Sequence, residues 1–571
     1  MDRRTLLALL LTAIVIVATP KIFPTSRREI PVQDTLAVVA TDTARSTAPL
    51  PATAAPSRTI GAAPPPSTTA PRSVAAETTT VRTEHAIYGI VSPGGTPASV
   101  TLPDHRSLRP GAQPDDRVSL FEPGERLVSL RFAGASDTIS LDTVAFRAEP
   151  QRTDGGAIIQ RLTSTNAAVP IALTYRFVTD SFVVDLSGSV GGSTPRTLLV
   201  QLPSRIRSDE ADVLDDTRHL AFAYRLAGNE VHSIKYGDLD SLVTRVDTGG
   251  IRWVSQRNKY FVLAAIPRAP DSTFRALITR GGVRTTNEAT SASAVAVLPL
   301  RDGTFAMRLF AGPQAWDHLR VTAPQLENVN PYGGWLHNLV QPFATIVMRL
   351  LLWMRDTFDV GYGWVLVIFG VAVRLLLWPL NQNAMRSSLK MQRLQPELAE
   401  IQKKFRDSPE KQRDAIMKLY ADHGMSPFSP LLGCLPMLLP MPILFALYFV
   451  FQNTIELRGV SFFWLPDLSL RDPLFITPLF MGISMFLLSW IGMRGVPPTP
   501  QSKMMAYAMP VMFTVLFWNF ASGLNLYYAV QNVAALPQQW LLSRERVKTA
   551  APTKPTAVAA KRTSLPGKKG G

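Results

Sequence analysis

The chain of 571 residues is 46% hydrophobic with a mean hydropathy of +0.10, which is high for a wholly soluble protein and predicts a membrane component. Its formal net charge of +16 would suit nucleic acid, but the basic residues stand beside apolar runs, where anionic lipid and membrane topology explain them more simply. The single cysteine, Cys434, excludes an intrachain disulfide and a cysteine-based metal site, and the lack of phosphate-binding glycine motifs predicts an activity without a cofactor.

Residues 1–23 are predicted to form a transmembrane signal anchor. Arg3 and Arg4 precede an apolar run from Leu6 to Ala18, a pattern that suits either a cleaved signal peptide or an anchor. Pro20 would be the first residue after cleavage, and proline there is unfavourable for signal peptidase, so the anchor is favoured. The two arginines place the start of the anchor in the cytoplasm.

The next two regions differ in composition and periodicity. Residues 24–84 are rich in Pro, Ala, Thr and Ser and lack apolar periodicity, which predicts a flexible periplasmic linker. In residues 85–325, apolar residues alternate with smaller or polar ones, as between Ile171 and Phe177. Because clusters of Gly, Pro and Asp separate these runs, we expect a large periplasmic β-sandwich domain.

After the β domain the periodicity becomes helical. In residues 331–360, apolar side chains recur every three or four positions from Leu336 to Met354. Trp335 and Trp353 suit a membrane interface, so the sequence predicts an amphipathic helix along the outer surface of the bilayer.

Residues 361–542 contain five apolar stretches, each close to the roughly 20 residues that span a bilayer. They are residues 361–380, 431–451, 473–493, 504–520 and 524–542. Together with the N-terminal anchor they predict six spans, five of which form the core. Clusters of Lys and Arg between the second and third spans and in the tail, 543–571, place both chain ends in the cytoplasm.

Residues 383–424 are predicted to form a cytoplasmic helical hairpin, with a break at Asp407-Ser408-Pro409 between two apolar stripes. Most of its charges suit a solvated face, with a docking surface for partners as the alternative. The basic tail similarly suits contact with anionic lipids, and its possible binding to ribosomal RNA is an unspecific alternative.

Arg374 stands in the middle of an apolar stretch, where a guanidinium costs about 2.5–3.5 kcal/mol on insertion scales. One interpretation is that its long side chain snorkels to the cytoplasmic interface. The other is that Arg374 lines a hydrated cavity open to the cytoplasm, where its charge attracts the acidic or polar part of a binding partner.

The last predicted span carries a polar stripe formed by Asn525, Tyr528 and Asn532, with Tyr527 and Gln531 beside it. Hydrogen bonds between helices are the simpler explanation for these residues taken alone. Combined with the buried charge of Arg374, the stripe favours a hydrated cavity.

Three other functional classes fit less well. A solute transporter, with an anionic substrate on Arg374, predicts internal repeats that the two halves do not show. A periplasmic chaperone merely anchored by its helices leaves the buried charge unexplained. A membrane hydrolase lacks a nucleophile and base pair, since the seven histidines lie outside the apolar stretches, so we expect no enzyme.

Several strings resemble the YidC/Oxa1/Alb3 family of membrane protein insertases, and the resemblance covers nearly the whole chain. They are Gly249-Gly250 with Trp253, Tyr260-Phe261 to Ile266-Pro267, the Arg374 helix through Trp378-Pro379-Leu380, Met391 to Pro396, Gly433-Cys434-Leu435-Pro436, Met441-Pro442-Ile443 to Tyr448, and Ser522-Gly523-Leu524 through Tyr527-Tyr528. The resemblance implies a periplasmic β-supersandwich, an interfacial helix and a five-helix core with a hydrophilic groove open to the cytoplasm and to lipid.

The resemblance also implies roles for particular residues. Arg374 matches the arginine of the groove, and Tyr527 and Tyr528 match tyrosines associated with client contact. Two positions depart from the family pattern: Gly370 stands where a groove threonine is common, and Pro440 where some relatives carry glutamine. Groove polarity is therefore expected to depend more heavily on Arg374 and the last span.

The partners implied by the resemblance are nascent membrane proteins, which the family inserts into the inner membrane alone or with the Sec translocon. Ribosome-bound chains are received through the cytoplasmic hairpin and tail, with the ribosome and the signal recognition particle receptor as further partners.

Overall fold

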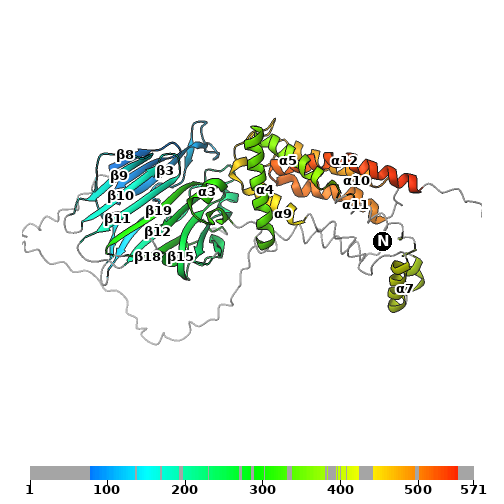
Figure 1. Cartoon of the computed structure of the whole chain (residues 1–571), viewed down its shortest axis with the longest axis horizontal. Helices are drawn as coiled ribbons and strands as arrows, with labels where there is room; N and C mark the ends of the chain where they lie inside the picture. The colour runs from blue at the N-terminus through cyan, green and yellow to red at the C-terminus, as the bar shows by residue number, and fades with distance from the viewer. Residues whose placement is uncertain are drawn as a thin grey trace, which may run out of the picture.

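The computed structural model describes residues 77–550, with gaps at 135–137, 167–169, 192–196, 229, 269–272, 285–287, 301, 331–336, 380–381, 383–393, 395–396, 399, 407, 423–440 and 495–499. The predicted anchor of residues 1–23 and the tail beyond Ala550 lie outside the described residues. The strands gather at one end of the molecule and the long helices at the other (Figure 1).

A small antiparallel sheet of four strands comes first in the chain. Its strands are β1 (Glu77–Arg82), β2 (Ile87–Ser92), β3 (Thr96–Arg106) and β4 (Arg117–Ser119). β1 lies within the stretch expected to be linker, so the prediction that the linker extends to residue 84 is wrong. Val81 is fully buried and pairs with Tyr88 on β2. Composition missed this strand because a threonine-rich segment is stabilised by its neighbour rather than by its own apolar pattern.

The remaining strands form one sheet of fifteen, with the order β6-β5-β12-β18-β17-β15-β16-β19-β11-β10-β9-β7, while β13 pairs with β14 and β15 and β8 pairs with β9. Their bounds are β5 (Ser129–Ala133), β6 (Thr138–Ser140), β7 (Phe146–Ala148), β8 (Arg152–Asp154), β9 (Ala157–Ser164), β10 (Ile171–Val178), β11 (Val183–Val190), β12 (Thr197–Leu202), β13 (Ala221–Leu226), β14 (Val231–Lys235), β15 (Arg245–Arg257), β16 (Phe261–Pro267), β17 (Phe274–Gly281), β18 (Ala292–Pro299) and β19 (Thr304–Pro313). The large β domain expected from the alternating pattern is therefore present.

β10 shows how the alternation forms the core. Ile171, Leu173, Tyr175 and Phe177 are all at most 2% exposed and point to one face, as the period of two requires. The hydroxyl of Tyr175 donates to the carbonyl oxygen of Gly95 at 2.7 Å, which connects the large sheet to the small one.

Short helices connect strands of the β domain or follow its last strand, before the helical core begins. They are η1 (Leu141–Thr143), α2 (Val213–Arg218), η2 (Tyr236–Asp238), α3 (Trp316–Thr322) and η3 (Leu326–Asn328). α2 begins at an Asp212 cap, whose carboxylate accepts from the amide of Asp215 at 2.9 Å.

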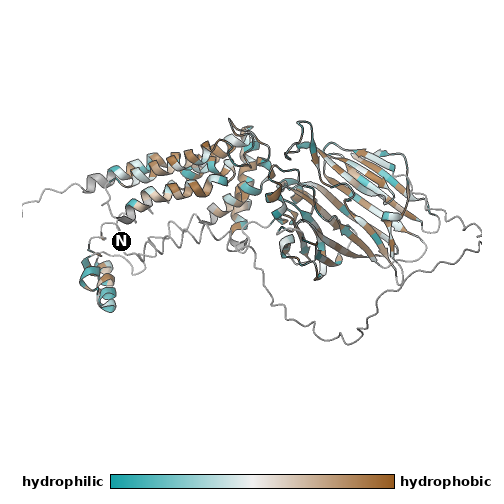
Figure 2. Cartoon of the chain, turned by 180° about the vertical axis from the view of Figure 1, so that it is seen from behind, coloured by the Kyte–Doolittle hydropathy of each residue, from teal (hydrophilic) through white to brown (hydrophobic). Residues whose placement is uncertain are grey.

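The helical core follows the β domain. Its elements are α4 (His337–Phe358), α5 (Tyr362–Leu376), α7 (Pro409–Asp422), α9 (Met441–Asn453), η5 (Ile455–Leu457), α10 (Ile476–Gly492), α11 (Pro500–Leu516), η6 (Phe517–Asn519) and α12 (Ser522–Ala550). α12 packs against α5 and α10, and α4 packs against α9. In Figure 2 the ribbons of the long helices are coloured largely as hydrophobic, whereas α7, the described part of the predicted hairpin's second helix, is mostly hydrophilic.

α4 is amphipathic, as the sequence predicts. It buries Val340, Ala344 and Val347 against the core, while Ile346 and Trp353 are exposed. Among the described residues, no helix taken alone combines the length and the apolar character needed to cross a bilayer. One pair of helices, Val340–Phe358 and Tyr362–Leu376, has the required length and apolar character when the two are taken together, and this pair is bent by 116°.

The helix bounds differ from the apolar stretches, and the differences at α11 and α12 are the most informative. α11 starts at Pro500 and ends at Leu516, each four residues earlier than expected. Hydropathy did not detect the start because the first turn of α11 is polar, and η6 (Phe517–Asn519) follows its end. α12 continues past residue 542 to Ala550, through Arg544 and Lys548. Arginine and lysine are both good helix formers, so the helix continues beyond the end of the apolar segment.

Candidate client-binding groove

Arg374 lies in the last turn of α5 and its side chain reaches α12. Its Nη2 donates to Oε1 of Gln538 at 3.0 Å, and Nε2 of Gln538 donates to the carbonyl oxygen of Trp378 at 3.1 Å. Gln538 is only 1% exposed. The glutamine thus connects the guanidinium on α5 to the residues directly after that helix, which favours an arginine bound to protein over one that extends freely toward the interface.

The guanidinium keeps unused hydrogen-bonding capacity. Nε of Arg374 is buried and has no hydrogen-bond partner among the described residues. An unpaired buried donor is costly, so the site is suited to an acceptor from water or from a client.

Tyr527 and Gln531 lie on the side of α12 that faces α5 and α9. Tyr527 is 1% exposed, and its ring contacts Phe369 and Phe451 at centroid distances of 5.7 and 5.4 Å. Nε2 of Gln531 donates to the Tyr527 hydroxyl at 2.6 Å. Tyr527 therefore belongs to the packed centre of the helical core, and Gln531 satisfies its hydroxyl.

The stripe formed by Asn525, Tyr528 and Asn532 faces other neighbours. Nδ2 of Asn532 donates to Oγ of Ser484 on α10 at 3.2 Å, and Nδ2 of Asn525 donates to the carbonyl oxygen of Phe517 in η6 at 3.1 Å. Tyr528 is partly buried, and its ring packs edge-on against Phe517 at 5.3 Å. For the two asparagines, the structure therefore shows the hydrogen bonds between elements that sequence reasoning kept as the simpler alternative.

Gly370 lies where α5 packs closely against α12. A Cβ added at Gly370 would lie 3.1 Å from Cγ1 of Val530 and 3.5 Å from Cδ2 of Tyr527. The glycine thus serves helix packing here. Pro440, the other departure from the family pattern, lies outside the described residues.

The six predicted residues of α5 and α12 other than Gly370 divide into two groups. Arg374, Tyr527 and Gln531 face the region between α5 and α12, while Asn525, Tyr528 and Asn532 contact η6 or α10. Sequence reasoning missed Gln538, the residue that binds Arg374. Gln538 lies seven residues after Gln531, so both side chains lie on the same face of α12, and this spacing could have identified Gln538 from the sequence.

An aromatic cluster lies at the opposite end of α5. Trp364 contacts Phe462 and Phe463 at 5.5 and 6.0 Å, and Phe463 is 73% exposed. Nε1 of Trp464 donates to the carboxylate of Asp472 at 3.2 Å. Exposed aromatic residues with one satisfied polar group are typical of the membrane–water interface.

Comparison with known proteins assigns the family. The model of the 60Kd inner membrane protein family matches residues 353–550, and the model of the YidC periplasmic domain matches residues 78–346. A membrane protein insertase YidC of Burkholderia multivorans is 30% identical over 508 residues, which cover 84% of this chain and 86% of the relative. The chain belongs to the YidC family of membrane protein insertases.

Other relatives agree with this family. The YidC insertase of Nitrosococcus oceani is 31% identical over 388 residues, covering 66% of this chain and 67% of the relative. Among solved structures, an active YidC insertase with its first transmembrane domain resolved is 17% identical, covers 81% of this chain and 92% of its own, and gives a TM-score of 0.33. The YidC family is non-enzymatic, as expected from the sequence.

Proposed function

We propose that this chain inserts newly made integral membrane proteins into the inner membrane and assists their folding, and that Arg374 lines the groove through which polar client segments pass. Family membership supports the overall activity. The observation that carries the role of Arg374 is its buried Nε, which has no hydrogen-bond partner among the described residues. Such a donor can bind a polar or acidic client group without first breaking an internal hydrogen bond.

The mechanism follows from solvation. Carrying a polar client tail through about 30 Å of hydrocarbon is costly, because its charges and amide groups lose water. A groove that holds water and a fixed positive charge partway across shortens this unfavourable path. The apolar client segment then leaves sideways into lipid, and no covalent bond is made or broken.

We further propose the topology that would place this groove toward the cytoplasm. Six spans have both chain ends in the cytoplasm and the β domain in the periplasm. The cationic residues of the 383–424 segment and of the tail support this orientation, as do Phe463 and Trp464 at the other end of the helices.

The partners we propose are nascent membrane proteins, the Sec translocon, the ribosome, the signal recognition particle receptor and anionic lipids. The Lys and Arg residues of α7 and the tail support contacts with ribosomal RNA and lipid headgroups through their charge. For the Sec translocon and the receptor, the support is family membership.

Substitution of Arg374 tests the electrostatic role. Arg374→Lys is expected to keep much of the insertion activity because lysine preserves the charge and loses only the planar donor fork. Arg374→Ala should impair clients with acidic translocated tails more than clients with neutral tails, and Arg374→Glu should be the worst change because it repels acidic tails. Insertion into vesicles is measured for clients that differ only in the charge of the translocated tail.

The matched control is Arg494→Ala, which removes a cation that lies 4.3 Å from the ring of Trp490 at the end of α10. It should affect all clients equally and weakly. Equal losses across the client series for Arg374→Ala, at matched protein levels, would leave Arg374 as a structural residue.

A further inference from the structure

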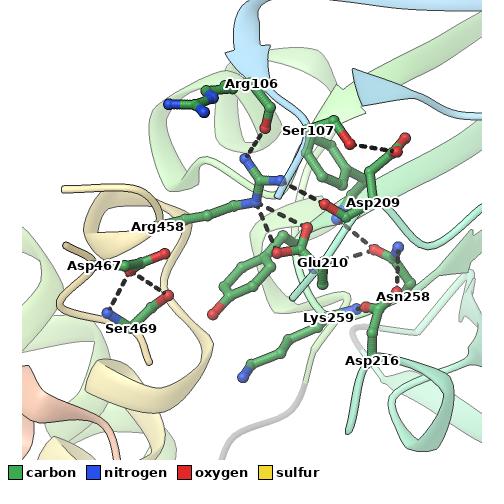
Figure 3. Close-up of polar contacts among 12 residues, drawn as sticks. Arg106, Ser107, Asp209, Glu210, Asp216, Asn258, Lys259, Arg458, Asp467 and Ser469 are labelled. Carbon is green, nitrogen blue, oxygen red and sulfur yellow. Dashed lines mark hydrogen bonds and ion pairs between the residues drawn. The ribbon is translucent and has the colours of Figure 1, made fainter. Parts of the chain in front are cut away.

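Arg458, in the connection between α9 and α10, binds the β domain with its whole guanidinium (Figure 3). Its Nε lies 2.8 and 3.0 Å from the two carboxylate oxygens of Glu210. Nη1 donates to the carbonyl oxygen of Arg106 at 3.0 Å, and Nη2 donates to that of Asp209 at 3.2 Å. One side chain of the helical core therefore forms hydrogen bonds with three residues of the β domain.

This contact is desolvated. The side chains of Arg458 and Glu210 are 3% and 5% exposed, and the guanidinium carbon lies 5.4 Å from the centre of the Phe261 ring. Burial raises the pKa of Glu210 to about 7 against the opposing attraction of Arg458. Buried ion pairs depend on both partners, because removing one leaves an uncompensated charge.

The surface that receives Arg458 is itself fixed within the β domain. The Asp209 carboxylate accepts from Oγ of Ser107 and from the amide of Ser119, both at 2.8 Å. On the other side of Glu210, the Asp216 carboxylate accepts from Nδ2 of Asn258 at 3.1 Å. Glu210 is thus presented by a preorganised loop, which reduces the entropy lost when Arg458 binds.

Two apolar contacts accompany the ion pair. Ile455, three residues before Arg458, belongs to the hydrophobic core of the β domain, and Trp316 of α3 packs against the core of the helical part. Beside the ion pair lies a cavity of about 890 Å³ with polar and charged groups in its wall, among them Lys259, Gln452 and Arg471. Close apolar packing does not continue across this part of the junction, so the specific contact of Arg458 carries more of the docking.

The connection that carries Arg458 is also bound to the start of α12. The amide of Ser522 donates to the carbonyl oxygen of Leu470 at 2.7 Å, and the amide of Gly523 donates to that of Leu468 at 2.9 Å. Oγ of Ser522 donates to the carbonyl oxygen of Asp467 at 3.1 Å. The connection between α9 and α10 is therefore bonded to the β domain through Arg458 and to the start of the helix that holds Gln538 through Ser522 and Gly523.

We propose that Arg458 is a positioning residue that docks the β domain onto the helical core and thereby fixes the placement of α12 relative to that domain. The Arg458–Glu210 pair acts as the specific element of this joint. Ile455 and Trp316 add apolar contact to the bonds of the charge-assisted pair.

The test measures the distance between the two parts directly. Spin labels are placed at exposed positions Leu242 in the β domain and Val533 on α12, in a Cys434→Ser background. The wild-type distance distribution should be narrow. Arg458→Glu and Glu210→Arg should each broaden it to about twice the wild-type width or more, because a buried charge faces its like. The charge-swapped double variant should recover much of the narrow distribution, although it cannot restore the bonds to the Arg106 and Asp209 carbonyls.

The matched control is the same swap at the exposed pair Arg218 and Glu288, whose nitrogen and oxygen atoms lie 2.9 Å apart within the β domain. That swap should leave the distance distribution unchanged. If a charge reversal at Arg458 or Glu210 prevents folding, Arg458→Lys replaces it and should give an intermediate width, because lysine keeps the charge but loses the fork.

Distributions as narrow as wild type in the single variants, or as broad in the charge-swapped double variant as in the singles, would overturn the proposal. Insertion measured on the same samples should fall about fivefold in the singles and recover in the double variant. Insertion that stays at the wild-type rate while the distribution broadens would remove the functional part of the inference. The distance readout does not depend on insertion, so it is also separate from the proposed function.

Discussion

Two arginines of the helical core bind distant parts of the chain, and the sequence indicates an unusual environment for only one of them. Arg374 interrupts an apolar stretch, so its environment follows from hydropathy. Arg458 stands in a connection of mixed composition, where a cation is expected to be solvated. Its burial results from Glu210, which lies 248 residues away in the chain.

The hydrogen bond between Arg374 and Gln538 predicts that the two side chains act together in the insertion of acidic clients. Gln538→Leu keeps the size of the side chain and removes the acceptor at 3.0 Å. Insertion of acidic clients should fall by about tenfold or more, since a hydrogen bond to a charged group contributes about 1.5–3 kcal/mol and about 1.4 kcal/mol is a factor of ten. A double-mutant cycle with Arg374→Ala checks the origin of the effect: the double variant should be no worse than Arg374→Ala alone, and additive losses would contradict the coupling.

His105 provides a pH-dependent contribution to stability. Burial lowers the pKa of His105 to about 4, with a further lowering by Arg458 and a partial offset by Asp104. The unfolded chain protonates His105 near its ordinary value of about 6.5, so between about pH 6.5 and 4 the unfolded state holds the extra proton. Stability therefore falls as the pH falls through this window, by up to about 3 kcal/mol.

The measurement compares thermal unfolding of wild type and His105→Gln at about pH 7 and about pH 5. Other groups also titrate here, among them Glu210 with its raised pKa, so the difference between the two proteins isolates His105. The wild type should lose more stability on acidification than the variant. An equal loss would show that His105 does not titrate in this window.

At the scale of elements, the contact of α5 with α12 explains why a glycine stands at position 370. A side chain there would approach Val530 and Tyr527 across the helix interface. The sequence predicted a polar stripe on α12, but not that Asn532 would face α10 while Tyr527 faces α5. Periodicity gives the relative angles of residues around one helix, whereas the neighbour on each side depends on packing.

Gly370→Thr tests this close approach. The added Cβ would meet Cγ1 of Val530 at 3.1 Å, and the remaining threonine atoms need further space. Overpacking of this kind costs about 1–3 kcal/mol, so the unfolding temperature should fall. Val530→Ala in the same chain should restore part of the loss by removing the contacted methyl group. Failure of this second change to help would place the strain elsewhere.

At the scale of the whole molecule, the β domain and the helical core are joined at a few specific contacts. The ion pair of Arg458 with Glu210 is buried, whereas Arg349 stacks over Trp316 at 5.1 Å. Arg374 lies in the helical core, so the proposed groove and the β domain are separate in sequence, and the Arg458 contact joins their two parts in the structure.

This separation predicts that a single substitution at the contact destabilises the protein, whereas deletion of most of the β domain leaves the helical core folded. Glu210→Ala leaves the Arg458 guanidinium buried without its carboxylate, which should destabilise the protein by about 3–5 kcal/mol. Deleting residues 106–320 removes the partner and exposes Arg458 to water, so the helical core should remain folded and keep some insertion activity. Thermal unfolding and vesicle insertion of the two variants check both expectations. A stably expressed deletion that inserts no client would show that the β domain is required for function.

The sequence by itself determined the β domain, the helical segments and the arginine within an apolar stretch, because alternation, helical periodicity and hydropathy are properties of neighbouring residues. Motif strings spread over the chain also identified the family. Only the tertiary structure decided which groups meet across long separations: Gln538 with Arg374, Glu210 with Arg458, and the strand β1 with β2 inside the expected linker. Such partners depend on how separate elements pack against one another, and local sequence patterns do not specify that packing.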